Sequence, residues 1–126
     1  MAKRHTYLST HTLSAAVLSF TLSAEDAALR DRATAAKSGR SAKTLIKEGQ
    51  LRITLIAMRK GAVLGVHQVE GVISVHVLRG SARLSAAGAN TELTSGGLLV
   101  LQEEVTHGVE ALSDCALLVT VALSAH

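Results

Sequence analysis

The chain has 126 residues, enough for one domain with a single hydrophobic core, and 48 % of them are hydrophobic while 18 % are charged. This balance excludes a largely disordered chain. The net charge of +3 comes from Lys and Arg residues spread along the sequence, and aromatic residues make up only 2 %. Both features argue against a nucleic-acid-binding protein. The single cysteine, Cys115, excludes an internal disulfide.

The first 24 residues have the outline of a secretory signal, with a basic beginning, an apolar middle and small residues before Glu25. Serine and threonine interrupt the apolar middle, which is too short and too polar to cross a bilayer. We therefore predict a cytoplasmic protein without a membrane partner. Export is the alternative, and residues 1–17 are interpreted as an extra strand or a loose arm.

One short helix is predicted at about residues 24–37. Ser23 can accept amide protons at the start of a helix, and the two acidic residues that follow favour the positive end of the helix dipole. Gly39 is typical of the residue just past a helix end. Residues 1–40 are therefore predicted to form an N-terminal arm with a short helix.

From residue 41 onward, short apolar or β-branched runs alternate with glycine-containing turns, which is typical of an antiparallel all-β unit. The predicted strands are 41–48, 51–59, 62–68, 72–79, 82–86, 90–94, 98–102, 105–112 and 115–123. Positive backbone angles are expected at the glycines between them, Gly49, Gly61, Gly71, Gly80, Gly88, Gly96 and Gly97. The spacing predicts a β-sandwich or closed barrel over residues 41–126.

Two stretches of this region resemble the paired motifs of the cupin superfamily, which are small jelly-roll barrels. The stretch GAVLGVHQVEGVISVHVLRG keeps the opening glycine, the five-residue gap, His67 and the closing glycine of the first motif. The stretch GLLVLQEEVTHGVEAL keeps the glycine and His107 of the second. The resemblance covers residues 41–123. The stretch GRSAKTLIKEGQLRITLIAMRKG ahead of the motifs also resembles the first strands of small single-domain bacterial cupins. The resemblance implies an all-β, cupin-type jelly-roll (double-stranded β-helix) barrel with a short N-terminal helix.

The sequence departs from the cupin pattern at two of the four metal-ligand positions that the resemblance implies. Val69 stands at the position of the second histidine of the first motif, and Ile73 at that of the glutamate. A divalent ion held by protein normally needs three or more N, O or S ligands. Binding of Fe, Mn, Zn or Ni by His67 and His107 is therefore kept only as an alternative to a site without a cofactor.

If the cupin register holds, both histidines face a cavity in the barrel. The predicted pocket residues are His67, His107, Val69, Ile73 and Val75. Side-chain alternation places His76 on the opposite face of its strand. Alternation leaves open which face of strand 51–59 lines the cavity. One face carries Ile53 and Leu55, and the other carries Arg52, Thr54 and Met58. An inward Arg52 favours a carboxylate or phosphate ligand, whereas the other set favours a small apolar molecule.

Three interpretations of the function follow. The first is a protein that binds a small molecule in the barrel near His67 and His107. The second is a metal-dependent or histidine-based enzyme of the oxygenase or isomerase type, with an incomplete metal site. The third is a structural, oligomer-forming protein with a filled barrel. Whether the protein is an enzyme stays open, and no catalytic residue is assigned.

Other polar residues give little support to an enzyme. Glu103 and Glu104 are interpreted as solvated charges in a turn. Tyr7, the only tyrosine, lies outside the motifs, which disfavours the chemistry of metal-free sugar epimerases that resemble this fold. A homodimer is predicted, because strands 41–48 and 115–123 are expected to be exposed sheet edges that need covering.

Overall fold

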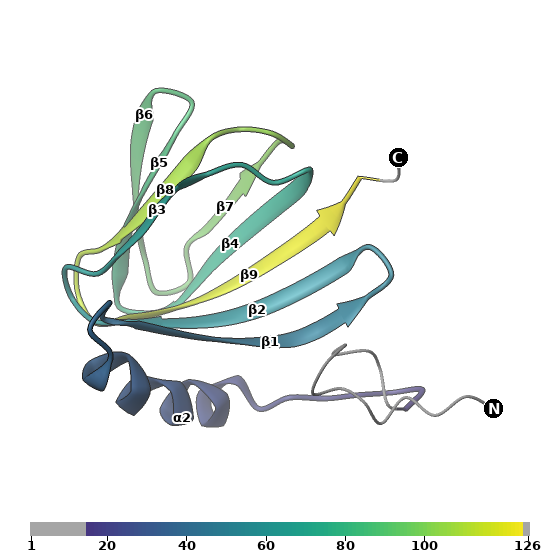
Figure 1. Ribbon diagram of the computed structural model, residues 1–126, viewed down its shortest axis with the longest axis horizontal. Helices are drawn as coiled ribbons and strands as arrows, with labels where there is room; N and C mark the ends of the chain where they lie inside the picture. The colour runs from purple at the N-terminus through teal and green to yellow at the C-terminus, as the bar shows by residue number, and fades with distance from the viewer. Residues whose placement is uncertain (1–14, 125–126) are drawn as a thin grey trace.

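The structure, a computed structural model, describes residues 15–124 except for the side chains of residues 66 and 67. In this range a single helix, α2 (Leu22–Ala35), precedes nine strands (Figure 1). The strands are β1 (Arg40–Glu48), β2 (Leu51–Met58), β3 (Val63–His67), β4 (Gly71–Arg79), β5 (Ser81–Ala86), β6 (Ala89–Thr94), β7 (Leu98–Leu101), β8 (His107–Ala111) and β9 (Cys115–Leu123).

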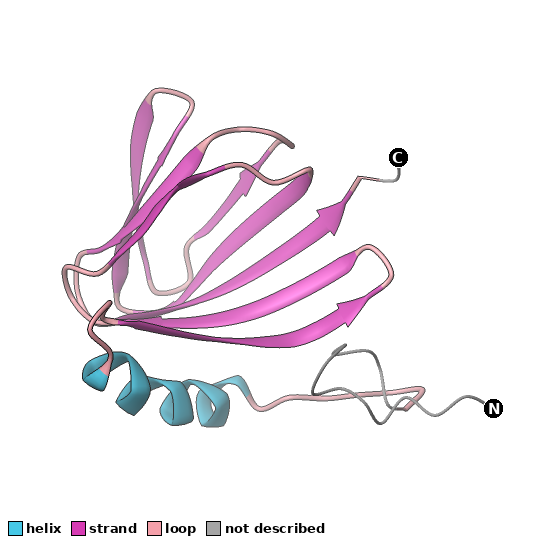
Figure 2. Cartoon of the chain, viewed as in Figure 1, coloured by secondary structure: helices cyan, strands magenta, loops and turns pink. Residues whose placement is uncertain are grey.

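The strands form two antiparallel sheets that face each other as the walls of a barrel (Figure 2). One sheet has the order β1-β2-β9-β4-β7, and the other has the order β3-β8-β5-β6. Helix α2 lies along the outer side of the five-stranded sheet, against β1 and β2 (Figure 1). The prediction of an all-β jelly-roll barrel with a short N-terminal helix is confirmed.

The helix begins two residues earlier than predicted. Its N-cap is Thr21 rather than Ser23, because the Thr21 carbonyl already accepts hydrogen bonds from the backbone N–H groups of Ala24 and Glu25. The Thr21 side chain makes no capping hydrogen bond. Within residues 15–124, no helix is both long enough and apolar enough to pass through a bilayer.

Strand β2 separates two hydrophobic clusters. Ile56 and Met58 belong to the core inside the barrel, whereas Leu55 and Ala57 pack against the buried Leu29 and its neighbours on α2. Because β2 pairs with β9 without a break, its side chains alternate strictly between the two clusters. The set of Arg52, Thr54 and Met58 therefore faces the barrel, which answers the question that the sequence left open.

The sheet edges differ from the expected ones. Strand β9 pairs with β2 on one side and with β4 on the other, so the prediction that residues 115–123 form an exposed edge is wrong. The edges of this sheet are β1, as predicted, and β7. The predicted homodimer stays a prediction. Apolar side chains that a second copy could cover are exposed on β4 and β7, at Val72 (49 %), Leu98 (60 %) and Val100 (60 %).

Gly71 has a different role from the one predicted. Its φ angle is not in the left-handed region, and neither is that of Gly97, although the other five glycines predicted in turns do have positive φ. Gly71 instead opens β4 where its backbone lies directly against β9. A Cβ atom added there would lie 2.5 Å from the Ala122 carbonyl oxygen, which is closer than packed atoms allow. Glycine is needed at this position for space and not for a turn.

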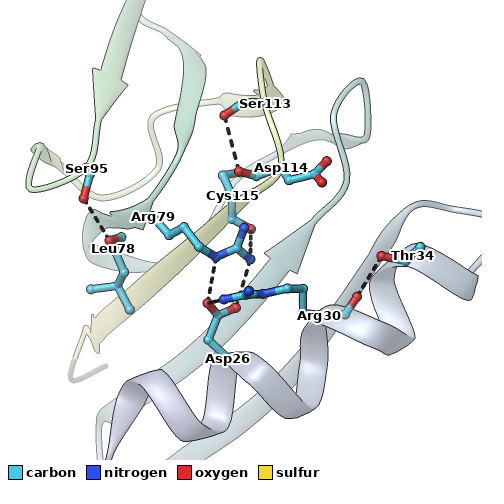
Figure 3. A network of polar contacts seen from close by, with 9 residues as sticks. All are labelled: Asp26, Arg30, Thr34, Leu78, Arg79, Ser95, Ser113, Asp114 and Cys115. Carbon is cyan, nitrogen blue, oxygen red and sulfur yellow. Dashed lines mark hydrogen bonds and ion pairs between the residues drawn. The ribbon is translucent and has the colours of Figure 1, made fainter.

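A buried ion pair fastens α2 to the barrel (Figure 3). Asp26 is only 5 % exposed. Its Oδ2 accepts a hydrogen bond from Arg79 Nε at 2.8 Å, its Oδ1 accepts one from Arg79 Nη2 at 3.1 Å, and Arg30 lies 3.2 Å away on the next helical turn. A register shift between Val77 and Arg79 turns the Arg79 side chain toward the helix, although strict alternation would send it inward.

The surroundings of Asp26 act on its pKa in opposite directions. Burial raises the pKa, but hydrogen bonds from Arg79 and Arg30 and the attraction of their charges outweigh burial, so the pKa of Asp26 lies below its usual range. The carboxylate is therefore ionised in the folded protein at neutral pH, and it stabilises the packing of helix against sheet. The sequence marked Asp26 only as a helix-start residue.

We predict that Gly71→Ala lowers the free energy of unfolding by about 2 kcal/mol, because the added methyl group forces β4 and β9 apart. Gly65→Ala is the matched control, because a Cβ at Gly65 meets no atom within 4 Å and its φ is not positive. Urea unfolding followed by circular dichroism measures both. Equal stability of the two variants would contradict the close contact at Gly71.

We predict that Asp26→Asn lowers the free energy of unfolding by about 2 kcal/mol at pH 7, because it leaves the partly buried Arg79 without its counter-charge. The stabilisation by a carboxylate whose pKa is lowered by folding is present above about pH 4 and is lost as the pH falls through the folded value. The difference between wild type and variant should therefore shrink below pH 4. Asp31→Asn, at an exposed position of the same helix, should show neither effect in the same urea titrations.

Candidate functional site

Strand pairing brings the two motif histidines together. His107 pairs with His67 on one side and with Ala86 on the other, and Ala86 pairs with Ala89. These four positions form a row across one end of the four-stranded sheet. A register shift in β3 between Leu64 and His67 precedes the pair. The backbone thus places two residues forty positions apart side by side, while the direction of the His67 side chain stays a prediction.

His107 is a buried side chain on the inner face of the sheet. It is 5 % exposed, and it shares the alternation of Val109 and Ala111, which both belong to the barrel core. Its Nδ1 lies 2.9 Å from the carbonyl oxygen of Val105. Because a carbonyl only accepts, Nδ1 carries the proton in this hydrogen bond, and in the neutral ring Nε2 is then the acceptor nitrogen.

His107 lines a cavity of about 610 Å³ between the β5–β6 hairpin and the segment that leads into β8. Its lining residues are Ser85, Ala86, Ala87, Gly88, Ala89, Asn90, Val105, Thr106 and His107. His107 is the one ionisable residue among them. Three others carry a hydroxyl or an amide, and the rest are small or apolar. The volume is typical of a small-molecule site.

The cavity wall is held by contacts from a neighbouring loop. Gln68 Nε2, in the connection between β3 and β4, donates a hydrogen bond to Thr106 Oγ1 at 2.8 Å. Farther along the same connection, the Val69 carbonyl accepts a hydrogen bond from the Glu104 backbone N–H at 3.0 Å. The loops on the two sides of the histidine pair are therefore tied to each other, which limits movement of the His107 end of the cavity.

The other predicted pocket residues lie elsewhere. Ile73 and Val75 are 3 % and 2 % exposed in the packed barrel core, and Val69 packs partly buried against that core. None of the three lines the cavity at His107. His76 lies on the outer face of its sheet, as predicted, since Val75 and Val77 on either side of it point into the core.

The hairpin of residues 85–90 is the part of the site that the sequence did not reveal. Its residues are mostly alanine and glycine, which give no chemical signal on their own. They shape the site by leaving space, and only the strand pairing shows that this space lies next to His107.

The described side chains do not fit a divalent metal ion. Among them, no group of three or more His, Cys, Asp or Glu residues could hold one. Val69 and Ile73, at the ligand positions implied by the cupin resemblance, offer only hydrocarbon. Two imidazoles fall short of the three donors that such an ion normally needs. Metal binding at His67 and His107 therefore stays a prediction.

Cys115 does not add a reactive group. Its side chain is fully buried in the barrel core, and burial raises the pKa of the Cys115 thiol to about 11. The thiol is protonated at neutral pH, whereas a nucleophile or a metal ligand needs the thiolate.

No protein-family model and no curated protein matches the sequence. Solved structures do match it. A conserved Streptococcus pyogenes protein of unknown function superposes with a TM-score of 0.67 at 22 % identity, over 72 % of this chain and 80 % of that chain. A cupin superfamily protein from Desulfitobacterium hafniense superposes with a TM-score of 0.66 at 14 % identity, over 68 % of this chain and 78 % of that chain.

An RmlC-like cupin from Desulfovibrio desulfuricans gives a TM-score of 0.62 at 28 % identity, over 66 % of this chain and 81 % of that chain. These similarities agree with the barrel of two antiparallel sheets that the strand pairing builds. The chain is therefore a small domain with the fold of the cupin barrels.

Proposed function

We propose that the protein binds a small molecule at the end of its barrel, beside His107 and His67. The observation that supports this most is the cavity at His107, where a buried imidazole lies against a wall of small residues. Barrels of this size are ordinarily filled by their own side chains. A space of this volume with a few polar groups is what recognition of a small ligand needs.

The polar groups of the cavity would orient the ligand. His107 offers an imidazole, Ser85 and Thr106 offer hydroxyls, and Asn90 offers an amide. The apolar remainder of the wall favours a ligand that is only partly polar. We assign no catalytic residue. A metal-dependent or histidine-based enzyme of the oxygenase or isomerase type remains the alternative, and the donor set of the described residues does not favour it.

A thermal-shift screen of small organic molecules tests the proposal. A ligand at one hundred times its Kd should stabilise the protein by about 2.7 kcal/mol, which raises Tm by about 10 °C in a domain of this size. Ala89→Leu should remove the shift, because the larger side chain fills the cavity from an exposed wall position. Ala28→Leu, at an exposed position of α2, is the matched control and should keep it.

His107→Gln should also lose the ligand response, because it removes the imidazole while keeping a polar side chain. The proposal fails if no organic molecule raises Tm, or if Ala89→Leu and Ala28→Leu respond alike. A rise in Tm with Fe, Mn, Zn or Ni that disappears in His107→Gln would instead support the metal-dependent enzyme.

A further inference from the structure

We propose that the bound molecule is an organic acid with an apolar body, and that Lys47 and Arg52 hold its carboxylate. This inference rests on the proposed function, since it names the chemical class of the same ligand. It comes from the five-stranded sheet, which faces the sheet of His107 across the barrel (Figure 2) and lies outside the residues that line the cavity at His107.

Lys47 and Arg52 are neighbours on the inner side of that sheet. They are directly paired residues of β1 and β2. Arg52 shares the alternation of Ile56 and Met58, which lie in the barrel core, and paired residues of adjacent strands lie on the same face. A register shift between Thr44 and Ile46 reverses the alternation in β1. Lys43 therefore lies on the other face from Lys47, where it forms an ion pair with Glu25 of α2 at 2.7 Å.

The two positive charges are not neutralised by nearby acids. Among residues 15–124, neither Lys47 nor Arg52 takes part in an ion pair. Arg52 Nη1 donates hydrogen bonds to the carbonyls of Gly49 at 2.8 Å and Leu51 at 3.0 Å, and its other two nitrogens make no hydrogen bond to a described residue. Like charges on paired strand positions repel each other, so an anion placed between them gains from both.

No carboxylate lies on the inner side of the barrel walls among the described strands. The inner positions, taken from the alternation and the core, are Arg40, Ala42, Thr44, Lys47, Arg52, Thr54, Ile56, Met58, Leu64, Gly71, Ile73, Val75, Val77, Ala82, Leu84, Ala86, Ala89, Thr91, Leu93, Leu99, Leu101, His107, Val109, Ala111, Cys115, Leu117, Val119, Val121 and Leu123. The interior therefore favours a negative ligand over a cation.

The rest of the row beside Arg52 is hydrocarbon. Strand pairing continues it through Val121 and Ile73 to Leu101. Val121 is only partly buried, whereas Leu117, two pairs farther into the barrel, is completely buried. Ile73 and Leu101 in this row are buried, so the apolar surface that is open beside Arg52 is that of Val121. A ligand with its carboxylate at Arg52 would place its body against this apolar surface.

Of the acids at this end, Glu48 follows Lys47 in β1 and falls on the outer face, and the others lie in loops. Glu70 lies between β3 and β4, and Glu103 and Glu104 lie between β7 and β8. All three are exposed, and Glu103 accepts a hydrogen bond from the Ser124 hydroxyl. They lie at the rim, outside the strand walls, and no ion pair joins any of the three to Lys47 or Arg52 in the part of the chain that the structure describes.

Isothermal titration calorimetry of the full chain with three probes tests the inference. Octanoate carries both the carboxylate and the apolar body, octanamide keeps the body without the charge, and inorganic phosphate keeps a charge without the body. We expect octanoate to bind, octanamide to bind at least about tenfold more weakly, and phosphate not to bind. Raising the salt concentration should weaken the binding of octanoate alone.

The double substitution Lys47→Gln with Arg52→Gln should lower the affinity for octanoate by at least about tenfold and leave that for octanamide unchanged. Arg32→Gln with Lys37→Gln is the matched control, because it removes two charges from exposed positions at the end of α2. Lys47→Gln alone is the second variant. This variant keeps the hydrogen bonds of Arg52 within the hairpin. We expect it to lower the affinity for octanoate severalfold.

The outcomes separate the two proposals. Equal binding of octanoate and octanamide, both lost in Ala89→Leu, would overturn the organic acid while the small-molecule site stands. If phosphate bound as tightly as octanoate, the inference that the ligand has an apolar body would be wrong. If the Lys47 and Arg52 variants and the helix control lost the same affinity for octanoate, the assignment of Lys47 and Arg52 as the carboxylate-binding residues would be wrong. Failure of every organic molecule in the screen would overturn the proposed function itself.

Discussion

The strict alternation of side chains along β2, β9 and β4 is the constraint on which the rest of the structure depends. Every second residue of these strands enters the barrel, and the residues between them face outward, where α2 covers β1 and β2. This alternation places Arg52 on the inner side of the barrel and His76 on its outer side, and it packs Leu55 against α2. It is broken in β4 at Arg79, where a register shift turns one side chain toward Asp26. The exception joins helix and barrel.

Most of the fold could be predicted from the sequence, because strand formation and turns leave local signals. The nine strands differ from the predicted ones by at most two residues at either end. Contacts between strands far apart in the sequence were harder to predict. The central place of β9 depends on pairing with β2 and β4, which no local pattern encodes. Gly71 was mistaken for a turn glycine for the same reason, since the backbone that requires it lies fifty residues away.

The site could be predicted only in part. The cupin resemblance directed attention to His67 and His107, and their strands do pair at these positions. It also directed attention to Ile73 and Val75, which lie in the packed core instead. The cavity wall escaped notice because alanine and glycine carry no functional groups. Lys47 escaped notice because its significance arises from being next to Arg52, and only the hairpin register shows this.

Ile73 lies between Val121 and Leu101 in the apolar row of the barrel. An acid introduced there by one substitution would lose its hydration without gaining a partner, at a cost of several kcal/mol. A cation could offset that cost only if His67 and His107 supplied the other two donors. Without such an ion the substituted chain would be less stable than the chain with Ile73. The packed hydrocarbon around Ile73 therefore makes a coordinating group at this position costly unless an ion arrives with it.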